Sequence, residues 1–228
     1  MLDSPCVRRA AASLQLLGLP FKHGSISIIC GFAQFAAINP VVKAPTLVCD
    51  DGTVLTDSNL IIDFAETLAA ARGHPRRSLM PAGIAEQRHA LRVLGLALAA
   101  CEKSVQIVCE HGVRPAENVH QPWVDRVTGQ MLAACGALEA EVAQRPLDAT
   151  AETIDQAGLT TAVVWCFMQA LTTPDAVPAG AYPLLHAHSL AAQRLAAFAT
   201  APHGEGTYIG ASPCCAACRP GSASRKHC

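Results

Sequence analysis

The chain has 228 residues, which is enough for one large domain or two small ones, each with its own hydrophobic core. Hydrophobic residues make up 51% of the sequence and charged residues 15%, which favours a packed globular protein over a disordered one. The formal net charge of -1 gives no reason to expect a nucleic acid or a membrane surface as a partner.

The first part of the sequence mixes helical and strand patterns. Ser4 is suited to an N-cap and Pro5 to the first turn of a helix, and Asp51-Gly52 is suited to a hairpin turn. The expected elements are, in chain order, a helix at 5–17, a strand at 21–29 (FKHGSISII), a short helix or turn at 32–40, strands at 46–49 and 54–55, and a helix at 59–71.

The second part of the sequence shows only helical spacing, in segments rich in alanine and leucine. Asp155 is expected to cap one of these helices, with Gly158 three residues after it. The expected helices lie at 85–109, 122–144, 156–171 and 183–198.

These patterns divide the chain into four parts. Residues 1–71 are expected to form an α/β domain, and residues 72–84, which are polar and contain prolines, a linker. Residues 85–210 are expected to form an all-helical domain, and residues 211–228 a flexible, cysteine-rich tail. No apolar run approaches the roughly 18 residues of a membrane span, and the N-terminus does not resemble a signal peptide. We therefore expect a cytoplasmic protein.

The 11 cysteines do not indicate a disulfide scaffold. Those outside the tail stand singly in apolar surroundings and are expected to be small buried hydrophobic residues. Those in the tail do not complete a zinc ligand set, so we expect no metal site. Trp123 and Trp165 are expected in the core. The first group is Cys6, Cys30, Cys49, Cys101, Cys109, Cys135 and Cys166, and the tail holds Cys214, Cys215, Cys218 and Cys228.

Three blocks of the sequence, SPCVRRAAASLQLLGLPF, NPVVKAPTLV and DDGTVLTDSNLIIDF, together resemble the N-terminal half of a cytosolic glutathione S-transferase of the serine type found in bacteria. They stand in the order and spacing of that family, and the AGLTTAVVW block in the second half fits it too. The resemblance covers about residues 2–210. It implies a thioredoxin-like α/β domain followed by an all-α bundle.

The resemblance also implies a site for glutathione. A cis peptide bond before Pro45 would turn the N–H and C=O of Ala44 towards the cysteinyl part of the tripeptide, like an added strand. Ser58, at a helix N-terminus, would bind the γ-glutamyl carboxylate. Asp57 would pair with the γ-glutamyl ammonium and Lys43 with the glycyl carboxylate. The plainer alternatives are an N-cap for Asp57 or Ser58 and a solvated loop charge for Lys43.

Ser4 resembles the serine whose hydroxyl stabilises the glutathione thiolate in serine-type transferases. The thiolate is the nucleophile, so a donor beside the sulfur at a helix N-terminus would lower its pKa. The alternative for Ser4 is a helix cap and nothing more. Cys6, two residues further on, is a weaker candidate for a redox role. Glutathione would be a substrate, and no other cofactor is implied.

A second substrate, a small hydrophobic electrophile, is expected against the helical domain, with Lys103, Gln106 and Cys109 as candidate contacts. Family analogy implies a homodimer and a role in detoxification. Two alternatives stay open. One is a non-catalytic ligand carrier or protein-interaction module of the same fold, and the other is a glutathione-dependent thiol reductase that uses Cys6.

The sequence departs from the family pattern at its beginning. Family members open with a strand ahead of the serine loop, and Met1-Leu2-Asp3 is too short to supply it. We therefore expect a thioredoxin-like domain whose first strand is missing. Because that strand would lie inside the sheet, its loss would expose apolar faces and an unpaired edge, and Ser4 would be weakly held. The alternative is a true start upstream of Met1.

Overall fold

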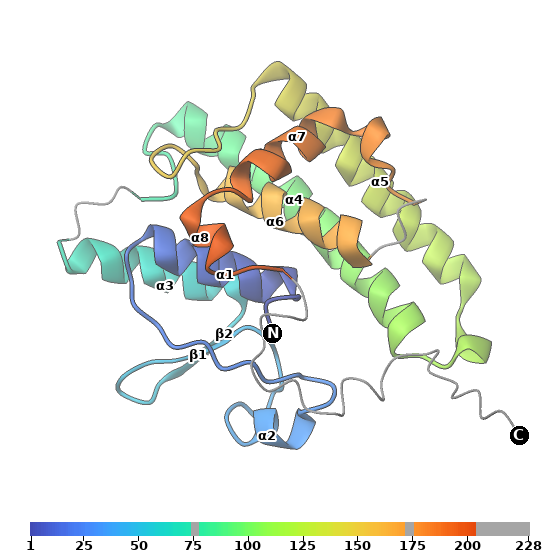
Figure 1. Ribbon diagram of the computed structural model, residues 1–228, viewed down its shortest axis with the longest axis horizontal. Helices are drawn as coiled ribbons and strands as arrows, with labels where there is room; N and C mark the ends of the chain where they lie inside the picture. Colours follow the sequence, from blue (N-terminus) through green and yellow to red (C-terminus); the bar gives the residue numbers. More distant parts are fainter. Residues whose placement is uncertain (74–77, 172–175, 204–228) are drawn as a thin grey trace, which may run out of the picture.

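The computed structural model describes residues 1–73, 78–171 and 176–203, and in it a small α/β part packs against a bundle of helices (Figure 1). The predicted fold class is confirmed. The elements are α1 (Pro5–Leu16), α2 (Phe32–Ala36), β1 (Thr46–Val48), β2 (Val54–Thr56), α3 (Ser58–Ala71), α4 (Ile84–Gly112), η1 (Ala116–Asn118), α5 (Gln121–Gln144), α6 (Gln156–Leu171), η2 (Ala179–Ala181), α7 (Pro183–Ala192) and α8 (Ala196–Ala199).

The sheet is the predicted hairpin. Strands β1 and β2 run antiparallel, with Thr46 opposite Thr56. The turn closes through a hydrogen bond of 2.9 Å from the N–H of Gly52 to the C=O of Cys49, and Gly52 has φ +85°, a conformation that glycine adopts without strain. The turn thus brings β2 back alongside β1. Strand β2 ends at Thr56, and α3 begins two residues later at Ser58.

The prediction of a strand at residues 21–29 is wrong. The segment is a loop whose backbone bonds are local, from the N–H of Ile26 to the C=O of Gly24 at 3.1 Å. A strand needs a neighbouring strand to form its ladder, and within the described ranges β1 pairs with β2 alone. The space between this loop and β1 is a hollow over α1 and α3, lined mainly by apolar residues. Its lining includes Ala10, Leu14, Phe21, Ile26, Leu47 and Ile61.

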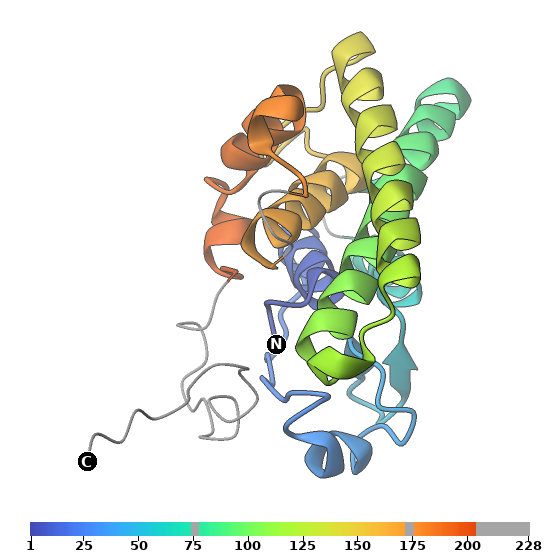
Figure 2. The ribbon, with the colours of Figure 1, turned by 90° about the vertical axis from the view of Figure 1, so that its right-hand side faces the viewer.

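Helix α1 connects the α/β part to the bundle, because it packs against α3, α6 and α8. In Figure 1 it lies between the hairpin and α8, and Figure 2 shows the hairpin and α2 at one end of the molecule. Buried polar side chains fix these contacts. Ser13 Oγ donates to Gln156 Oε1 at 3.1 Å, and Arg8 Nε donates to the C=O of Ala201 at 2.7 Å. A buried hydrogen bond of this kind is costly to leave unmade, so α1 has one position against the bundle.

The bundle follows the predicted helices closely. A shared core of α4, α5, α6 and α7 contains Val93, Ala97, Val127, Met131, Leu138, Val164, Trp165 and Leu185. The expected cap of α6 is confirmed, since Asp155 Oδ1 accepts from the N–H of Gly158 at 2.8 Å. Across the described ranges, no helix combines the length and apolar character that crossing a membrane would require.

The prediction of one helix at 183–198 is wrong, because the chain breaks between α7 and α8. Gln193 lies at the break, where its side chain accepts from Arg8 and donates to the C=O of Ala162. The change of direction lays α8 on α1 and buries Phe198, whose ring lies 5.5 Å from the Arg8 guanidinium. The contact between Arg8 and Gln193, which are 185 residues apart in the sequence, thus outweighs the helical pattern that runs through 183–198.

Two predictions about buried residues are partly wrong. Trp165 is 2% exposed, as predicted, but Trp123 lies in the first turn of α5 and is 40% exposed. Of the described cysteines, Cys101 and Cys135 are buried, Cys109 is exposed, and the others are partly exposed. Apolar neighbours in the sequence do not determine which side of a helix faces the solvent. The four tail cysteines lie outside the described residues.

Candidate functional site

The loop ahead of β1 contains a cis peptide bond between Ala44 and Pro45, which confirms that prediction. The hydroxyl of Thr56 holds the loop, donating to the C=O of Lys43 at 3.2 Å and to the C=O of Pro45 at 3.3 Å. Neither the N–H nor the C=O of Ala44 has a hydrogen-bond partner among the described residues. These two groups can therefore pair with an extended peptide.

Asp57 connects this loop to the start of α3. Its Oδ1 accepts from the N–H of Asn59 at 2.9 Å, so it is the N-cap of α3, and its Oδ2 lies 3.0 Å from Lys43 Nζ. Burial alone would raise the pKa of Asp57, but these hydrogen bonds and the charges of Lys43 and Arg9 hold it below its ordinary value. A carboxylate is thus kept ionised beside the loop of Ala44.

The backbone is unusual on both sides of the loop. Val42 has φ 51° and Asp57 has φ 75°, and these are the two non-glycine residues with positive φ in the described ranges. Such conformations cost roughly 1–3 kcal/mol each and occur most often at functional sites. Their position supports the choice of this loop as a site.

Ser58, the first residue of α3, is 5% exposed, and its Oγ accepts from Arg9 Nη1 at 3.1 Å. The same Arg9 nitrogen donates to Asn59 Oδ1 at 2.6 Å. Arg9 is itself only 1% exposed, and within the described ranges its Nε has no acceptor and no carboxylate lies at salt-bridge distance. Burial lowers the pKa of Arg9, while neighbouring Cys6, Cys101 and Asp57 raise it. A buried positive charge therefore lies directly beneath the N-terminus of α3.

Two thiols face this charge. Cys6 on α1 packs against the bundle core that contains Cys101 on α4, and each thiol acts on the pKa of the other. The interaction with Cys101 lowers the pKa of Cys6 to about 7, against the effect of burial and of the Asp57 charge, and Arg9 and the Ser58 hydroxyl add to the decrease. The pKa of Cys101 is raised by its interaction with Cys6 and by burial. Cys6 is thus the more acidic thiol of the pair.

Ser4 is the N-cap residue of α1, with extended backbone, and its C=O accepts from the N–H of Arg8 at 2.9 Å. Its hydroxyl makes no capping hydrogen bond with α1. Ser4 is thus the N-cap of α1 by position and through its C=O, while its side chain takes no part in the cap. The hydroxyl is left available for another acceptor, two residues before Cys6.

The candidate contacts for a second substrate lie along α4. Lys103 Nζ is 2.8 Å from Glu102 Oε1, and Gln106 Nε2 donates to the same oxygen at 3.1 Å. Gln106 Oε1 is buried without a partner in the described part of the chain. Cys109 is exposed two turns beyond Cys101. Lys103 and Gln106 thus share one carboxylate, and their role in binding a substrate stays a prediction.

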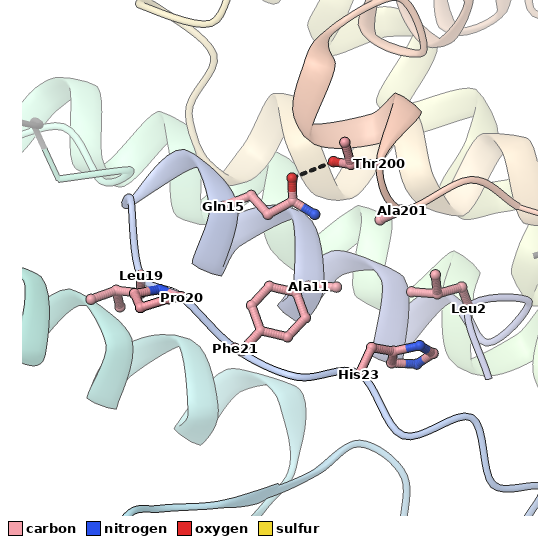
Figure 3. Close-up of a pocket in the computed structure, with 9 residues that line it drawn as sticks. All are labelled: Leu2, Ala11, Gln15, Leu19, Pro20, Phe21, His23, Thr200 and Ala201. Atoms are coloured by element: carbon pink, nitrogen blue, oxygen red, sulfur yellow. Dashed lines mark hydrogen bonds between the residues drawn. The ribbon is translucent and has the colours of Figure 1, made fainter.

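A separate cavity of about 400 Å³ lies on another face of α1 (Figure 3). Ala11 and Gln15 line it from α1, and Thr200 donates a hydrogen bond to Gln15 across it. Positions 11 and 15 point away from position 9 on a helix, and none of the predicted site residues lines this cavity. It therefore does not belong to the loop site. Its lining is Leu2, Ala11, Gln15, Leu19, Pro20, Phe21, His23, Thr200 and Ala201.

Arg9 and Cys101 are not among the site residues that the sequence predicts. For Arg9 the sequence offers only its place, as a basic residue within an otherwise apolar helical run, and charged residues of such a run usually face the solvent. For Cys101 the sequence offers no signal, because its contact with Cys6 spans 95 residues and depends on how α4 lies against α1.

Comparisons with known proteins agree with this geometry. Residues 1–73 match the family model of the glutathione S-transferase N-terminal domain. No curated protein matches the chain significantly.

Several solved structures share the fold over most of the chain. A glutathione transferase family member from Pseudomonas fluorescens Pf-5, with bound glutathione, is 23% identical, with a TM-score of 0.75 over 90% of this chain and 97% of that one. A glutathione S-transferase from Methylobacterium radiotolerans JCM 2831, in complex with glutathione sulfonate, is 20% identical, with a TM-score of 0.77 over 89% of this chain and 92% of that one. A maleyl pyruvate isomerase, described as a bacterial glutathione S-transferase of the zeta class, is 21% identical, with a TM-score of 0.71 over 93% and 98%.

The low pKa of Cys6 leads to a pH prediction. A thiol reacts as its thiolate, which forms above the pKa, so alkylation of Cys6 by iodoacetamide should reach half of its maximal rate near pH 7. The charged and titrating groups that face Cys6 are Arg9 from α1, Asp57 from the start of α3 and Cys101 from α4. Burial raises the pKa of Cys109, so its alkylation should need a higher pH. Mass spectrometry of digests measures both rates in one sample, and parallel pH profiles for Cys6 and Cys109 would contradict the assignment.

Proposed function

We propose that the chain is a glutathione S-transferase that conjugates the thiol of glutathione to a small hydrophobic electrophile, since its residues 1–73 match the N-terminal domain of that family and the whole chain shares the fold of solved glutathione transferases. The observation that carries the proposal is the meeting of the Ala44 loop with the N-terminus of α3, joined by the ion pair of Lys43 and Asp57. One surface thereby offers free backbone groups, a carboxylate, an ammonium and a helix N-terminus. Glutathione has the complementary groups in its extended backbone, its ammonium and its two carboxylates.

The tripeptide would lie across this surface in one direction. The N–H and C=O of Ala44 pair with the cysteinyl residue, and the first turn of α3 at Ser58 binds the γ-glutamyl carboxylate. The buried charge of Arg9 adds to the attraction for an anion there, because it lies against Ser58 and no carboxylate among the described residues is at salt-bridge distance from it.

The ammonium and the glycyl carboxylate of glutathione would replace the contact between Lys43 and Asp57 with one contact to each side chain. Asp57 would take the γ-glutamyl ammonium, and Lys43 would take the glycyl carboxylate. Their side chains are 33% and 52% exposed, so the existing pair contributes at most about 1 kcal/mol and is readily replaced. The ion pair therefore holds both side chains at the site, and breaking it costs little free energy when glutathione binds.

The Ser4 hydroxyl would donate to the glutathione sulfur. Its position at the N-terminus of α1, without a capping bond of its own, fits this role. A hydroxyl donor and the positive end of a helix both stabilise a thiolate, which then attacks the electrophile directly. The electrophile would approach from α4, where Lys103 and Gln106 are the proposed contacts.

A second candidate function is glutathione-dependent thiol reduction through Cys6. The observation that favours it is the pKa of about 7 for this thiol, which makes Cys6 a competent nucleophile at neutral pH. This function predicts disulfide reduction that is lost in Cys6→Ser and retained in Ser4→Ala. A ligand carrier of the same fold would show glutathione binding without either reaction.

We also propose a homodimer. Leu60 and Phe64 lie one turn apart on α3 and are 63% and 37% exposed, and such an apolar pair on a helix surface is suited to a subunit contact. A cytoplasmic location and a role in detoxification stay predictions.

Replacing Ser4 by alanine tests the catalytic role. We expect about a 10²-fold loss of kcat with 1-chloro-2,4-dinitrobenzene, the effect of removing one donor to a developing anion. Retention on immobilised glutathione should not change, because the hydroxyl contacts the sulfur alone. Ser78→Ala, at an exposed serine far along the chain, is the matched control. Undiminished turnover in Ser4→Ala would refute the role, and retention of the unmodified chain without turnover would favour the carrier.

Replacing Asp57 by asparagine separates its two roles. Asparagine accepts the capping hydrogen bond of Asn59 and tolerates positive φ, so the melting temperature should change little. The charge that pairs with the γ-glutamyl ammonium is lost, so the Kd for glutathione should rise at least about tenfold. Asp51→Asn is the matched control, since Asp51 caps the hairpin turn in the same way through Thr53. An unchanged Kd for glutathione in Asp57→Asn would show that Asp57 serves only as the N-cap of α3.

A further inference from the structure

Two cysteines from distant parts of the chain meet at the contact between α1 and the bundle. Cys6 packs against the core cluster that contains Cys101, and each of the two thiols shifts the pKa of the other. Cys101 is 3% exposed and belongs to the core of the bundle, and Cys6 packs against the same core from α1. Cys6 is partly exposed, so a small molecule in solvent reaches Cys6 but not Cys101. The other described thiol in the bundle core, Cys135, contacts Met168 instead, with 3.9 Å between the sulfur atoms.

Polar groups around Cys6 favour a negative charge on its sulfur. The Arg9 guanidinium and the Ser58 hydroxyl both lower the pKa of Cys6, and Arg9 lowers that of Cys101 as well. Arg9 is 1% exposed and its Nε has no acceptor within the described ranges, although a buried polar group almost always has one. An uncompensated buried cation beside two thiols is suited to a reactive thiolate rather than to two inert core residues.

We propose that Cys6 and Cys101 form a redox couple, in which a peroxide oxidises Cys6 and Cys101 then closes a disulfide between α1 and α4. In the first step the Cys6 thiolate attacks the O–O bond of the peroxide ROOH. The sulfur becomes a sulfenic acid, and the alkoxide that leaves takes up a proton as ROH. The peroxide is reduced by two electrons, and Cys6 is oxidised by two.

In the second step the Cys101 sulfur attacks the Cys6 sulfur and forms the S–S bond. The hydroxide that leaves combines with the proton of the Cys101 thiol as water. Two equivalents of a low-molecular-weight thiol return the couple to its starting state, since they reduce the disulfide to two thiols and become a disulfide themselves. The couple does not depend on the proposed conjugation of glutathione.

The environment orders the two steps. Cys6 reacts first because it is the more exposed and the more acidic thiol. Cys101 is held protonated while Cys6 is charged, because the interaction with Cys6, followed by burial, raises the pKa of Cys101. The sulfenic acid is neutral, so oxidation of Cys6 removes the charge that keeps Cys101 from ionising. Cys101 then attacks a neighbour with which it is already in contact.

The experiment treats the full-length protein with hydrogen peroxide, blocks free thiols, digests with trypsin and measures the peptides by mass spectrometry. Residues 1–8 and 93–103 are tryptic peptides that carry one cysteine each, so a disulfide between them is distinct from any in the tail. We expect this cross-linked pair, lighter by two hydrogen atoms than the reduced peptides, and its loss on treatment with glutathione. Cys6 should be oxidised at least about tenfold faster than Cys109.

Two variants complete the test. Cys109→Ser, on the exposed side of α4, should still form the cross-link. Cys101→Ser should form none, and Cys6 should instead accumulate as sulfinic and sulfonic acid because no second thiol intercepts the sulfenic acid. The oxidation products of the unmodified protein test the proposal even if Cys101→Ser does not fold. If peroxide converts its Cys6 to sulfinic acid without the cross-link, or oxidises Cys6 no faster than Cys109, the proposal is overturned.

Discussion

The arrangement of the site depends on one buried cation. The Arg9 guanidinium reaches from α1 to the first turn of α3, where it donates to Ser58 Oγ and Asn59 Oδ1. Because no carboxylate in the described ranges lies at salt-bridge distance from this buried arginine, its two neutral acceptors on α3 fix the direction of the guanidinium. The N-termini of α1 and α3 are therefore held in one relative position, as a peptide-binding surface built on both of them requires.

Neighbouring residues of α1 extend this constraint into the bundle. Arg8 is bonded to the C=O of Ala201 and lies against Phe198, and Ser13 is bonded to Gln156 at the start of α6. The helix that carries Ser4 and Cys6 is thus fixed on three sides by buried hydrogen bonds. The hollow beside β1, where the described sheet has no further strand, does not disturb these contacts, because they lie on other faces of α1.

The sequence was sufficient wherever the chemistry is local. The hairpin around Gly52, the cap of α6 at Asp155 and the cis bond before Pro45 each follow from a few adjacent residues or from a family block, and the structure confirms them. The sequence did not predict the elements whose structure depends on a residue far away in the chain. Residues 21–29 alternate like a strand but have no neighbouring strand, and the break between α7 and α8 depends on Arg8. Burial of Arg9 and its contact with two thiols likewise required the tertiary structure.

In the proposed function the Ala44 loop and the α3 N-terminus form one site for glutathione, with the γ-glutamyl group on α3. The most direct measurement is calorimetric titration of the full chain with glutathione and with the dipeptide Cys-Gly, which lacks the γ-glutamyl group. We expect saturable binding of one glutathione per chain, and a Kd for Cys-Gly at least about tenfold higher, since Asp57 and Ser58 lose their ligand groups. Equal affinities for the two peptides, or no binding of glutathione, would contradict this site.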